Sequence, residues 1–411
     1  MSLRELTSLE FQDFLKEVPQ ASFMQSLAMA KLLEKRGAQI RYLAYCQQDE
    51  ILVAALAFVH SVLGGLRLEI NCGPVHKDST ALTHFYQELA DYANQEGVLE
   101  LIVKPYDSYQ EFDSDGQPRT DEGKELIQDL TQHGFQFDGL QTGYPGGEPD
   151  WHYVKDLSGL SLQDLNGSFS KRGKALLKKA NTFGISLRKL KREELHLFKE
   201  ITEATSDRRE YADKSLDYYQ DFFDAFGEQA EFMVATLNFH DYLSHLEGDQ
   251  GKLKEKMDRL EEALASNPQA TKKANQLREL TSQYETFEVR QAEAQELIER
   301  YGQEDVLLAA SLFLYTDKEA TYLFSGSYPE FNKFYAPALL QEYVMQEALR
   351  RSLTFYNFLG IMGIFDGSDG VLRFKQNFNG YIVRKMGTFR YYPQPLKYKV
   401  LQFIKKITGR L

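Results

Sequence analysis

The stretch of this chain from residue 322 to residue 380 ends in the sequence TFYNFLGIMGIFDGSDGVLRFKQNFNG (residues 354–380). In and just before it, apolar spacing and turn residues predict a strand, a turn, a long helix and a second strand, in that order. The expected ranges are 320–324, 326–329, 337–351 and 354–359. A strand, a helix and a strand that lead into a glycine-rich loop are typical of a site built at the end of a sheet.

The loop after the second strand leads into a basic and aromatic segment. It contains Gly360, Gly363, Gly367 and Gly370, with Asp366 and Asp369 between them. Glycine lets the backbone approach a ligand closely or turn through positive φ. The same pattern is also typical of plain surface connections between elements. Taken alone, the loop favours a binding site and an ordinary connection equally.

Length and composition set the class of the protein. The chain has 411 residues, enough for two or three domains, and a formal net charge of -12. This charge argues against nonspecific nucleic-acid binding by the whole surface, although it allows local basic patches. Cys46 and Cys72 lack metal-binding spacing, and neither a signal segment nor a membrane-spanning apolar run occurs. We therefore expect a cytoplasmic protein with reduced thiols.

One order of elements occurs twice along the chain. The first copy is predicted as helices 9–17 and 26–37, strands 40–46, 51–60 and 66–72, helix 81–94 and strand 98–103. The second is predicted as helix 193–205, strands 232–237, 306–315 and 320–324, helix 337–351 and strand 354–359. The repeat predicts an α/β (α+β) protein with two tandem domains, residues 1–150 and residues 151–239 with 301–395, and a cleft at or between the sheets.

Residues 240–300 differ from the rest, because charges dominate and apolar residues recur on a heptad. The heptad positions are Leu246, Leu253, Met257, Leu260, Leu264, Leu277, Leu280, Tyr284, Phe287, Ala294 and Ile298. Residues 266–268 interrupt the pattern in the middle. Two helices joined by such a break predict an antiparallel coiled-coil arm, rather than a packed helical subdomain, because the apolar stripe is narrow.

Two basic segments are notable in this acidic chain. The first contains Lys171, Arg172, Lys174, Lys178 and Lys179, followed by Arg188, Lys189, Lys191 and Arg192. Its clustering indicates a phosphate or RNA contact, although charge runs are commonly solvated faces. The second is the tail 396–411, in which Val400, Phe403, Ile404, Ile407 and Leu411 recur at helical spacing among lysines. A basic amphipathic helix there fits either an anionic membrane surface or a cap on the core.

Several common catalytic motifs are absent from the sequence. It contains no Walker loop, no GxGxxG, no HExxH and no cysteine pair spaced for zinc, and its eight histidines are scattered. We therefore expect neither a metal site nor covalent catalysis. Chemistry by positioning and charge stabilisation remains, and Lys375, framed by Phe374 and Phe378, is the candidate to stabilise an oxyanion in acyl transfer. Residue type alone favours an ordinary surface lysine at this position.

A set of stretches spread over nearly the whole chain carries a family resemblance. They are Phe23-Met24-Gln25-Ser26 with Lys31 and Gly37, residues 171–184, residues 207–219, Phe324-Ser325-Gly326-Ser327, residues 355–363 and residues 370–380. Together they resemble the FemABX family of tRNA-dependent aminoacyltransferases, which build cross-bridges on peptidoglycan precursors. The resemblance implies two acyltransferase domains like those of N-acetyltransferases (GNAT-like), with a helical hairpin inserted at residues 240–300.

The resemblance also implies the substrates. The donor is a small amino acid (alanine, serine or glycine) esterified to tRNA, and no cofactor is implied beside this aminoacyl-tRNA. The acceptor is the lysine amine, or the growing branch, of a muramyl pentapeptide precursor, usually on lipid II. The basic segment at 171–192 then contacts tRNA, and the tail brings the enzyme to the inner face of the membrane.

Roles for single residues follow from the same resemblance. Lys31, Lys214 and Tyr218 lie where the family contacts the diphosphate and sugar of the precursor, and Tyr328 is a looser candidate for that set. Phe374 and Lys375 match the pair at the catalytic channel, where the lysine stabilises the tetrahedral intermediate. Asp107 is the candidate general base, and the substrate or the tRNA ribose is the alternative acceptor of the proton.

Two other functions stay open from the sequence. A coenzyme A-dependent GNAT N-acetyltransferase shares the expected fold, but it needs a glycine-rich loop at a helix start, and residues 171–174 contain one glycine. A non-catalytic protein that recruits partners through the coiled coil belongs to a different class, and only activity distinguishes it.

Overall fold

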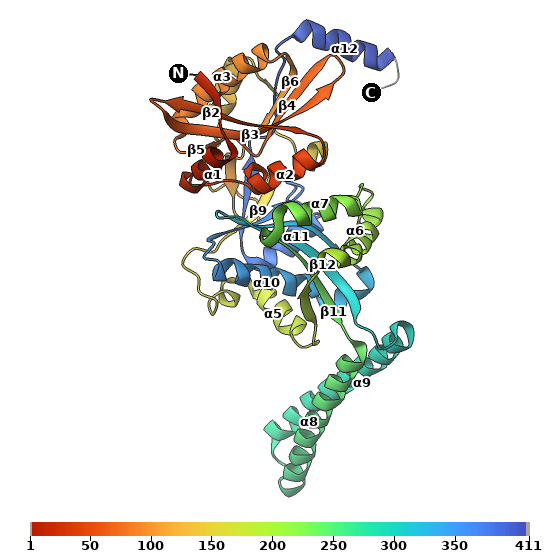
Figure 1. Cartoon of the computed structure of the whole chain (residues 1–411). Helices are drawn as coiled ribbons and strands as arrows, with labels where there is room; N and C mark the ends of the chain where they lie inside the picture. The colour runs from red at the N-terminus through yellow and green to blue at the C-terminus, as the bar shows by residue number, and fades with distance from the viewer. Residues whose placement is uncertain (1, 408–411) are drawn as a thin grey trace.

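The structure is a computed structural model that describes residues 2–407 (Figure 1). Within this range the chain forms a mixed α/β protein with two sheets of eight strands each, in agreement with the predicted class. The first sheet has the order β1-β2-β3-β4-β6-β16-β8, and β5 pairs with β3. Its strands are β1 (Ser2–Glu5), β2 (Gln39–Gln47), β3 (Glu50–Val62), β4 (Gly65–Asn71), β5 (Val75–His76), β6 (Val98–Lys104), β8 (Gln136–Phe137) and β16 (Phe389–Tyr391).

The second sheet has the order β10-β11-β12-β13-β14-β9-β15-β7. Its strands are β7 (Ser108–Phe112), β9 (Trp151–Asp156), β10 (Ser186–Lys189), β11 (Ala230–Leu237), β12 (Val306–Tyr315), β13 (Ala320–Ser327), β14 (Phe355–Gly360) and β15 (Tyr381–Lys385). The sheets exchange strands across the predicted boundary at residue 150, because β7 lies in the second sheet and β16 in the first. The chain therefore crosses between the two sheets several times.

Twelve helices accompany the sheets within residues 2–407. They are α1 (Ser8–Glu17), α2 (Leu27–Lys35), α3 (Leu82–Gln95), α4 (Glu125–Gln132), α5 (Lys171–Ala180), α6 (Leu195–Arg209), α7 (Leu216–Phe226), α8 (Phe239–Ser266), α9 (Thr271–Tyr301), α10 (Ala336–Arg350), α11 (Gly370–Lys375) and α12 (Pro395–Ile407). Among the described residues, no helix is both long and apolar enough to cross a bilayer.

Each sheet contains the repeated unit that the sequence predicts. Three antiparallel strands lead into a helix and then into a strand parallel to the third, as β2-β3-β4-α3-β6 and as β11-β12-β13-α10-β14. A helix is needed there because adjacent parallel strands require a crossover connection. Helix α3 is amphipathic and buries one face against its sheet, whereas α10 is buried over most of its surface.

The two copies differ at the parallel pair. In the first sheet β4 and β6 pair along their whole length, from Leu66 with Val98 to Asn71 with Lys104. In the second sheet β13 and β14 pair only at Ala320 with Tyr356 and at Thr321 with Asn357. Beyond these two pairs, the backbone of residues 322–327 in β13 and that of residues 358–360 in β14 are not hydrogen-bonded to each other. We call this opening the β13–β14 fork.

A shared apolar core holds the two sheets together. It contains residues from α1 and from the 3-10 turn Phe23–Gln25 on one side, and from α6, α7, β11 and β12 on the other. Across this core the rings of Phe23 and Phe226 lie 6.4 Å apart. Because the interface is apolar and buried, we expect the sheets to move as one body.

The segment predicted as an arm forms two long antiparallel helices, α8 and α9, that project from the second sheet (Figure 1). Every predicted heptad position, from Leu246 to Ile298, is buried or half-buried. Residues 267–270 make the connection, close to the predicted break. Knobs-into-holes packing of a coiled coil stays a prediction.

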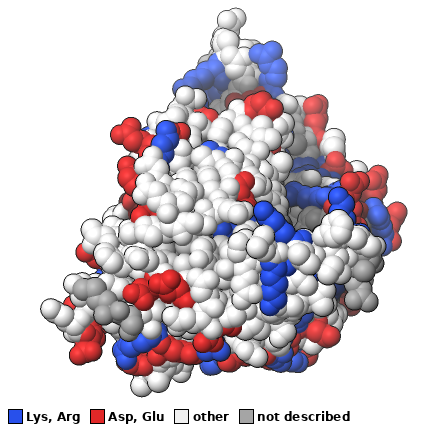
Figure 2. Space-filling view, turned by 90° about the horizontal axis from the view of Figure 1, so that it is seen from above, with Lys and Arg blue, Asp and Glu red and all other residues white. Residues whose placement is uncertain are grey.

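The tail forms α12 at the end of the molecule opposite the arm (Figure 1). Figure 2 looks down on that end. Residues 408–411, which include the predicted apolar position Leu411, lie outside the described residues.

The side chain of Gln25 offers a test of the fold, because it forms hydrogen bonds with the backbone of both β3 and β4 in the first sheet. Its amide donates to the carbonyl oxygens of Leu56 (3.2 Å) and Asn71 (2.8 Å), and its carbonyl accepts from the Leu56 N–H (2.7 Å). Gln25 is fully buried, so Gln25→Ala leaves three buried polar groups unpaired and should destabilise the protein by roughly 3 kcal/mol. Urea unfolding followed by circular dichroism measures this loss.

Gln12→Ala, on the exposed face of α1, is the matched control and should stay close to wild type. Equal midpoints for the two variants would show that Gln25 does not hold β3 and β4 in place.

Candidate functional site

Lys375 is buried at the β13–β14 fork. Its ammonium group donates to the carbonyl oxygens of Phe358 (2.7 Å), Leu359 (3.1 Å) and Gly360 (2.6 Å). Only 3% of the residue is exposed, which excludes the ordinary surface lysine that residue type alone favoured. Three acceptors match the three N–H donors of a charged lysine.

The three carbonyls converge because β14 bulges. Its register against β9 shifts between Asn357 and Gly360, and Leu359 takes a positive φ of 55°. The side-chain oxygen of Asn357 accepts from the Leu359 N–H at 2.8 Å and holds this bend. A bulge of this kind re-aims backbone groups at a site. The sequence signal for it is weak, because Asn357 reads as an ordinary strand residue.

The charge of Lys375 is set by its surroundings. Burial lowers the pKa of the Lys375 ammonium to about 7, against the opposing effect of the Asp369 carboxylate. Asp369 caps α11 by accepting from the N–H groups of Val371 (2.8 Å) and Leu372 (3.1 Å). Arg209, exposed at the end of α6, also lowers the pKa of Lys375, so a second cation acts on the fork. The sequence analysis did not single out Asp369 as a cap or Arg209 as a site residue.

The segment that follows Lys375 packs against the basic helix α5. The Asn377 carbonyl accepts from both the N–H and the hydroxyl of Ser170, each at 3.1 Å. A Cβ at Gly173 would overlap this carbonyl, so only glycine allows the contact. Phe374 is half-buried beside Lys375, and its ring lies 5.5 Å from that of Phe378. The helix with the predicted tRNA contacts therefore packs directly on the segment that carries Lys375.

The basic side chains of α5 all face solvent. They are Lys171, Arg172, Lys174, Lys178 and Lys179. The opposite face is buried through Gly173, Leu177 and Ala180. An exposed row of cations, on a helix whose buried face packs against the segment after Lys375, is an arrangement suited to contact with a phosphate backbone.

A second cluster lies where α2 meets α7. The Lys214 ammonium and the Arg36 guanidinium lie 5.4 Å and 5.3 Å from the centre of the Tyr218 ring, and burial raises the pKa of Tyr218 to about 12. The structure thus brings Lys214 and Tyr218 together and adds Arg36, which the sequence analysis missed. Lys31 is exposed on α2, one turn before Lys35.

Tyr328 lies apart from this pair, at the end of β13. Its hydroxyl is 3.5 Å from a carboxylate oxygen of Glu200 on α6, and burial raises its pKa to about 12. Its backbone follows directly on the fork edge 322–327.

Asp107 follows β6 and pairs with His76, whose Nε2 lies 3.1 Å from its carboxylate. The preceding residue, Tyr106, is held by residues of the second sheet and its loops through both its side-chain hydroxyl and its backbone carbonyl. Its hydroxyl donates to Glu319 (2.7 Å) and accepts from Asn357 (3.1 Å), while its carbonyl accepts from Lys385 (2.7 Å). Asn357 therefore links the bend that holds Lys375 to the residue beside Asp107.

Buried titratable groups surround Tyr106. Burial raises the pKa of Glu319 to about 7, although the Tyr106 hydroxyl and Lys385 oppose the shift. Burial and the nearby Lys385 lower the pKa of His152 to about 3, so its ring stays neutral. A small cavity of about 40 Å³ lies here between the sheets and is lined in part by Cys72, Tyr106, His152 and Lys385.

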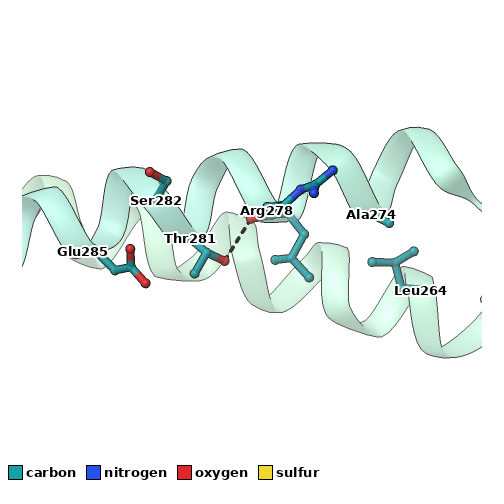
Figure 3. Close-up of a pocket in the computed structure, with 7 residues that line it drawn as sticks. Leu264, Ala274, Arg278, Thr281, Ser282 and Glu285 are labelled. Atoms are coloured by element: carbon teal, nitrogen blue, oxygen red, sulfur yellow. Dashed lines mark hydrogen bonds between the residues drawn. The ribbon is translucent and has the colours of Figure 1, made fainter.

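A larger groove of about 420 Å³ lies elsewhere, near the tip of the arm (Figure 3). It opens between α8 and α9, where Leu264 and the small side chain of Ala274 face each other. None of the predicted site residues lines it. Within the described part of the chain, no group of His, Cys, Asp or Glu side chains is placed to hold a metal ion.

The chain is similar to known proteins along its whole length. The FemAB family profile matches residues 6–406. The aminoacyltransferase FemB of Staphylococcus epidermidis is 26% identical over 419 residues, and the aminoacyltransferase FemA of Staphylococcus aureus is 26% identical over 420 residues. Both matches cover 100% of each chain. A solved structure, the crystal structure of FemX, superposes with a TM-score of 0.76 at 21% identity and covers 97% of this chain and 99% of that one.

The buried carboxyl group of Glu319 predicts a pH dependence of stability. The pKa of the Glu319 carboxyl is about 7 in the folded protein, and 4.5 is the usual value for a glutamate in water, as in the unfolded chain. Between these two pH values the folded protein keeps a proton that the unfolded chain has released. The stabilisation is fully present below about pH 4.5 and is lost as the pH rises through about 7, by at most about 1.4 kcal/mol per pH unit. Glu319→Gln should remove this dependence, as measured by urea midpoints between pH 5 and pH 8.

The exposed Glu193→Gln is the control and should keep the wild-type profile. A Glu319→Gln profile parallel to that of wild type would mean that Glu319 is ionised throughout this range.

Proposed function

The chain belongs to the FemAB family, and on that premise we propose that it transfers an aminoacyl group from tRNA to an amine of a peptidoglycan precursor. The observation that carries the proposal is the ammonium of Lys375 buried at the fork, on a segment that packs against α5, whose opposite face is cationic. The names of the FemA and FemB relatives, both aminoacyltransferases, support the reaction class.

In the proposed reaction the acceptor amine attacks the ester carbonyl of the aminoacyl-tRNA. A C–N bond forms, the tetrahedral intermediate collapses, and the ribose oxygen leaves with the electrons of the C–O bond. The ester is already activated, so alignment and stabilisation of the oxyanion are the main demands on the protein. The amine loses one proton, and the ribose oxygen gains one.

Lys375 is the proposed oxyanion partner. All three of its N–H donors point at backbone carbonyls, so the oxyanion takes the place of one carbonyl acceptor when the acyl group enters the fork. Such an exchange is favourable because a full negative charge is a stronger acceptor than a carbonyl dipole. Arg209 adds positive potential at the same place.

Asp107 is the proposed base, and His76 holds its carboxylate in a fixed orientation. The clamp on Tyr106 supports this role, because it ties the backbone beside Asp107 to the bulge that holds Lys375. The ribose oxygen of the donor is the alternative destination of the proton.

The acceptor is proposed to be the lysine amine, or the growing branch, of the muramyl pentapeptide on lipid II. Lys31, Lys214 and Tyr218 are the proposed contacts to its diphosphate and sugar, with Tyr328 as a further contact. The ammonium of Lys214 over the Tyr218 ring supports an anionic ligand there, whereas Arg36 is already paired with Asp221 at 3.1 Å. The donor is alanine, serine or glycine.

A coenzyme A-dependent acetyltransferase is the alternative within the same fold. The start of α5 argues against it, because Gly173 packs on the carbonyl of Asn377 and so does not open a cradle for a pyrophosphate. A non-catalytic protein would not need a buried ammonium at the fork.

Lys375→Met tests the role of the ammonium. With lipid II carrying a lysine stem and tRNA charged with labelled alanine, serine or glycine, wild type should transfer one of the three. The variant should lose about 100-fold or more in kcat, because the oxyanion has no charged partner. Lys16→Met, at an exposed lysine, should keep full activity. Retained transfer in folded Lys375→Met would contradict the role, and no transfer by wild type would contradict the reaction.

Removing charge from α5 tests the tRNA contact. The double substitution Lys174→Gln and Lys178→Gln should raise KM for aminoacyl-tRNA several-fold and flatten its salt dependence, while kcat stays near wild type. The control is Lys16→Gln with Lys124→Gln, which removes two positive charges from exposed sites outside α5 and should leave KM at the wild-type value. If both double variants give the same KM, α5 is not the tRNA contact.

A further inference from the structure

Helix α12 packs on the protein with the less apolar of its two sides. The side chain of Leu401 lies over Gly64 in the turn between β3 and β4, and the ring centres of Tyr398 and Tyr392 lie 4.2 Å apart. Tyr398, Leu401 and Gln402 are half-buried. The helix is thus held on the first sheet, beside β6, by a polar and aromatic face.

The apolar side of α12 is turned away from the protein. Leu396 is 79% exposed, Val400 58%, Phe403 65% and Ile407 68%. At 3.6 residues per turn these four positions form one stripe, about half a turn away from the side that packs. The exposed Leu63, next to Gly64, adds to the apolar surface at this end. The tail therefore does not cap the core, which was one of the two alternatives from the sequence.

Lysines border this stripe. Lys399 and Lys406 lie along one edge and Lys397 along the other, and all three are exposed. They stand out in a chain whose net charge is -12. Viewed onto this end, the molecule shows a broad uncharged area with both basic and acidic side chains around it (Figure 2). An apolar stripe with basic edges is complementary to a surface that is anionic outside and apolar beneath.

We propose that α12 docks this protein on an anionic lipid bilayer, lying in the plane of the headgroups with Val400, Phe403 and Ile407 in the acyl boundary. Lys397, Lys399 and Lys406 then reach the lipid phosphates, while Leu401 and Tyr398 keep the helix fixed to the first sheet. The arm at the opposite end of the molecule points away from the bilayer (Figure 1).

A second copy of the chain fits this face less well. A helix of 13 residues is about 20 Å long, so its exposed stripe offers on the order of 200 Å². A stable protein interface needs about 800 Å² from each partner. A bilayer has no such minimum, because every apolar side chain that enters it adds to binding.

The test is flotation of the full-length protein with vesicles of phosphatidylcholine alone and with vesicles that contain 30% phosphatidylglycerol. We expect binding to the anionic vesicles, weaker binding to the neutral ones, and loss of binding at high salt. Phe403→Ser with Ile407→Ser should weaken binding at least tenfold. Lys399→Gln with Lys406→Gln should weaken binding to anionic vesicles only.

The control is Leu9→Ser with Val289→Ser, which removes two equally exposed apolar side chains from other places. It should bind as wild type. Absence of binding to either vesicle, or wild-type binding by the Phe403 and Ile407 variant, would overturn the proposal. A third result would also overturn it: if wild type sediments as a dimer and the Phe403→Ser, Ile407→Ser variant sediments as a monomer, the stripe is the contact with a second copy of the chain. The vesicles carry no acceptor, so the result is independent of the proposed reaction.

Discussion

The account depends on one interaction, the ammonium of Lys375 held by three consecutive carbonyls of β14. A buried charge is tolerated only when its donors are satisfied, and here the backbone satisfies all three. The bend at Leu359 that aims these carbonyls at one point lies directly after the last pair of β14 with β13. The fork and the positive charge in it therefore lie at the same bend. The first sheet keeps its parallel pair closed and has no such opening.

The site is also coupled to the other sheet. Asn357 holds the bend through the Leu359 N–H and bonds the hydroxyl of Tyr106 with its amide. Glu319 and Lys385 fix the same tyrosine from the second sheet, and a shared apolar core holds the sheets together. A change in the relative position of the sheets would therefore disturb both Asp107 and the carbonyls around Lys375. This coupling ties the fork in the second sheet to Tyr106 and to the neighbouring Asp107.

Much of the fold could be predicted from the sequence, because the long elements have strong periodicity. Each strand and helix of the predicted repeat is present, and every heptad position of the arm is buried or half-buried. Short strands such as β7, β15 and β16 were not predicted. Each has only a few residues of mixed polarity, which is too short for an alternating apolar pattern to be recognised. The exchange of β7 and β16 between sheets depends on long-range pairing, which local sequence does not encode. Among the candidate site residues, the sequence singled out Lys375 and Tyr218, whereas Arg36, Asn357 and Arg209 reach the candidate site through interactions between segments far apart in the chain.

Hydrogen exchange with a donor analogue tests directly whether the acyl donor binds in the fork that holds Lys375. A short RNA hairpin that carries alanine through a 3′-amide in place of the ester would bind without reacting. The account predicts slower exchange at residues 322–327 and 358–375, the two sides of the fork, and no change along the closed pair of β4 and β6. Protection confined to the first sheet, with the fork unchanged, would contradict it.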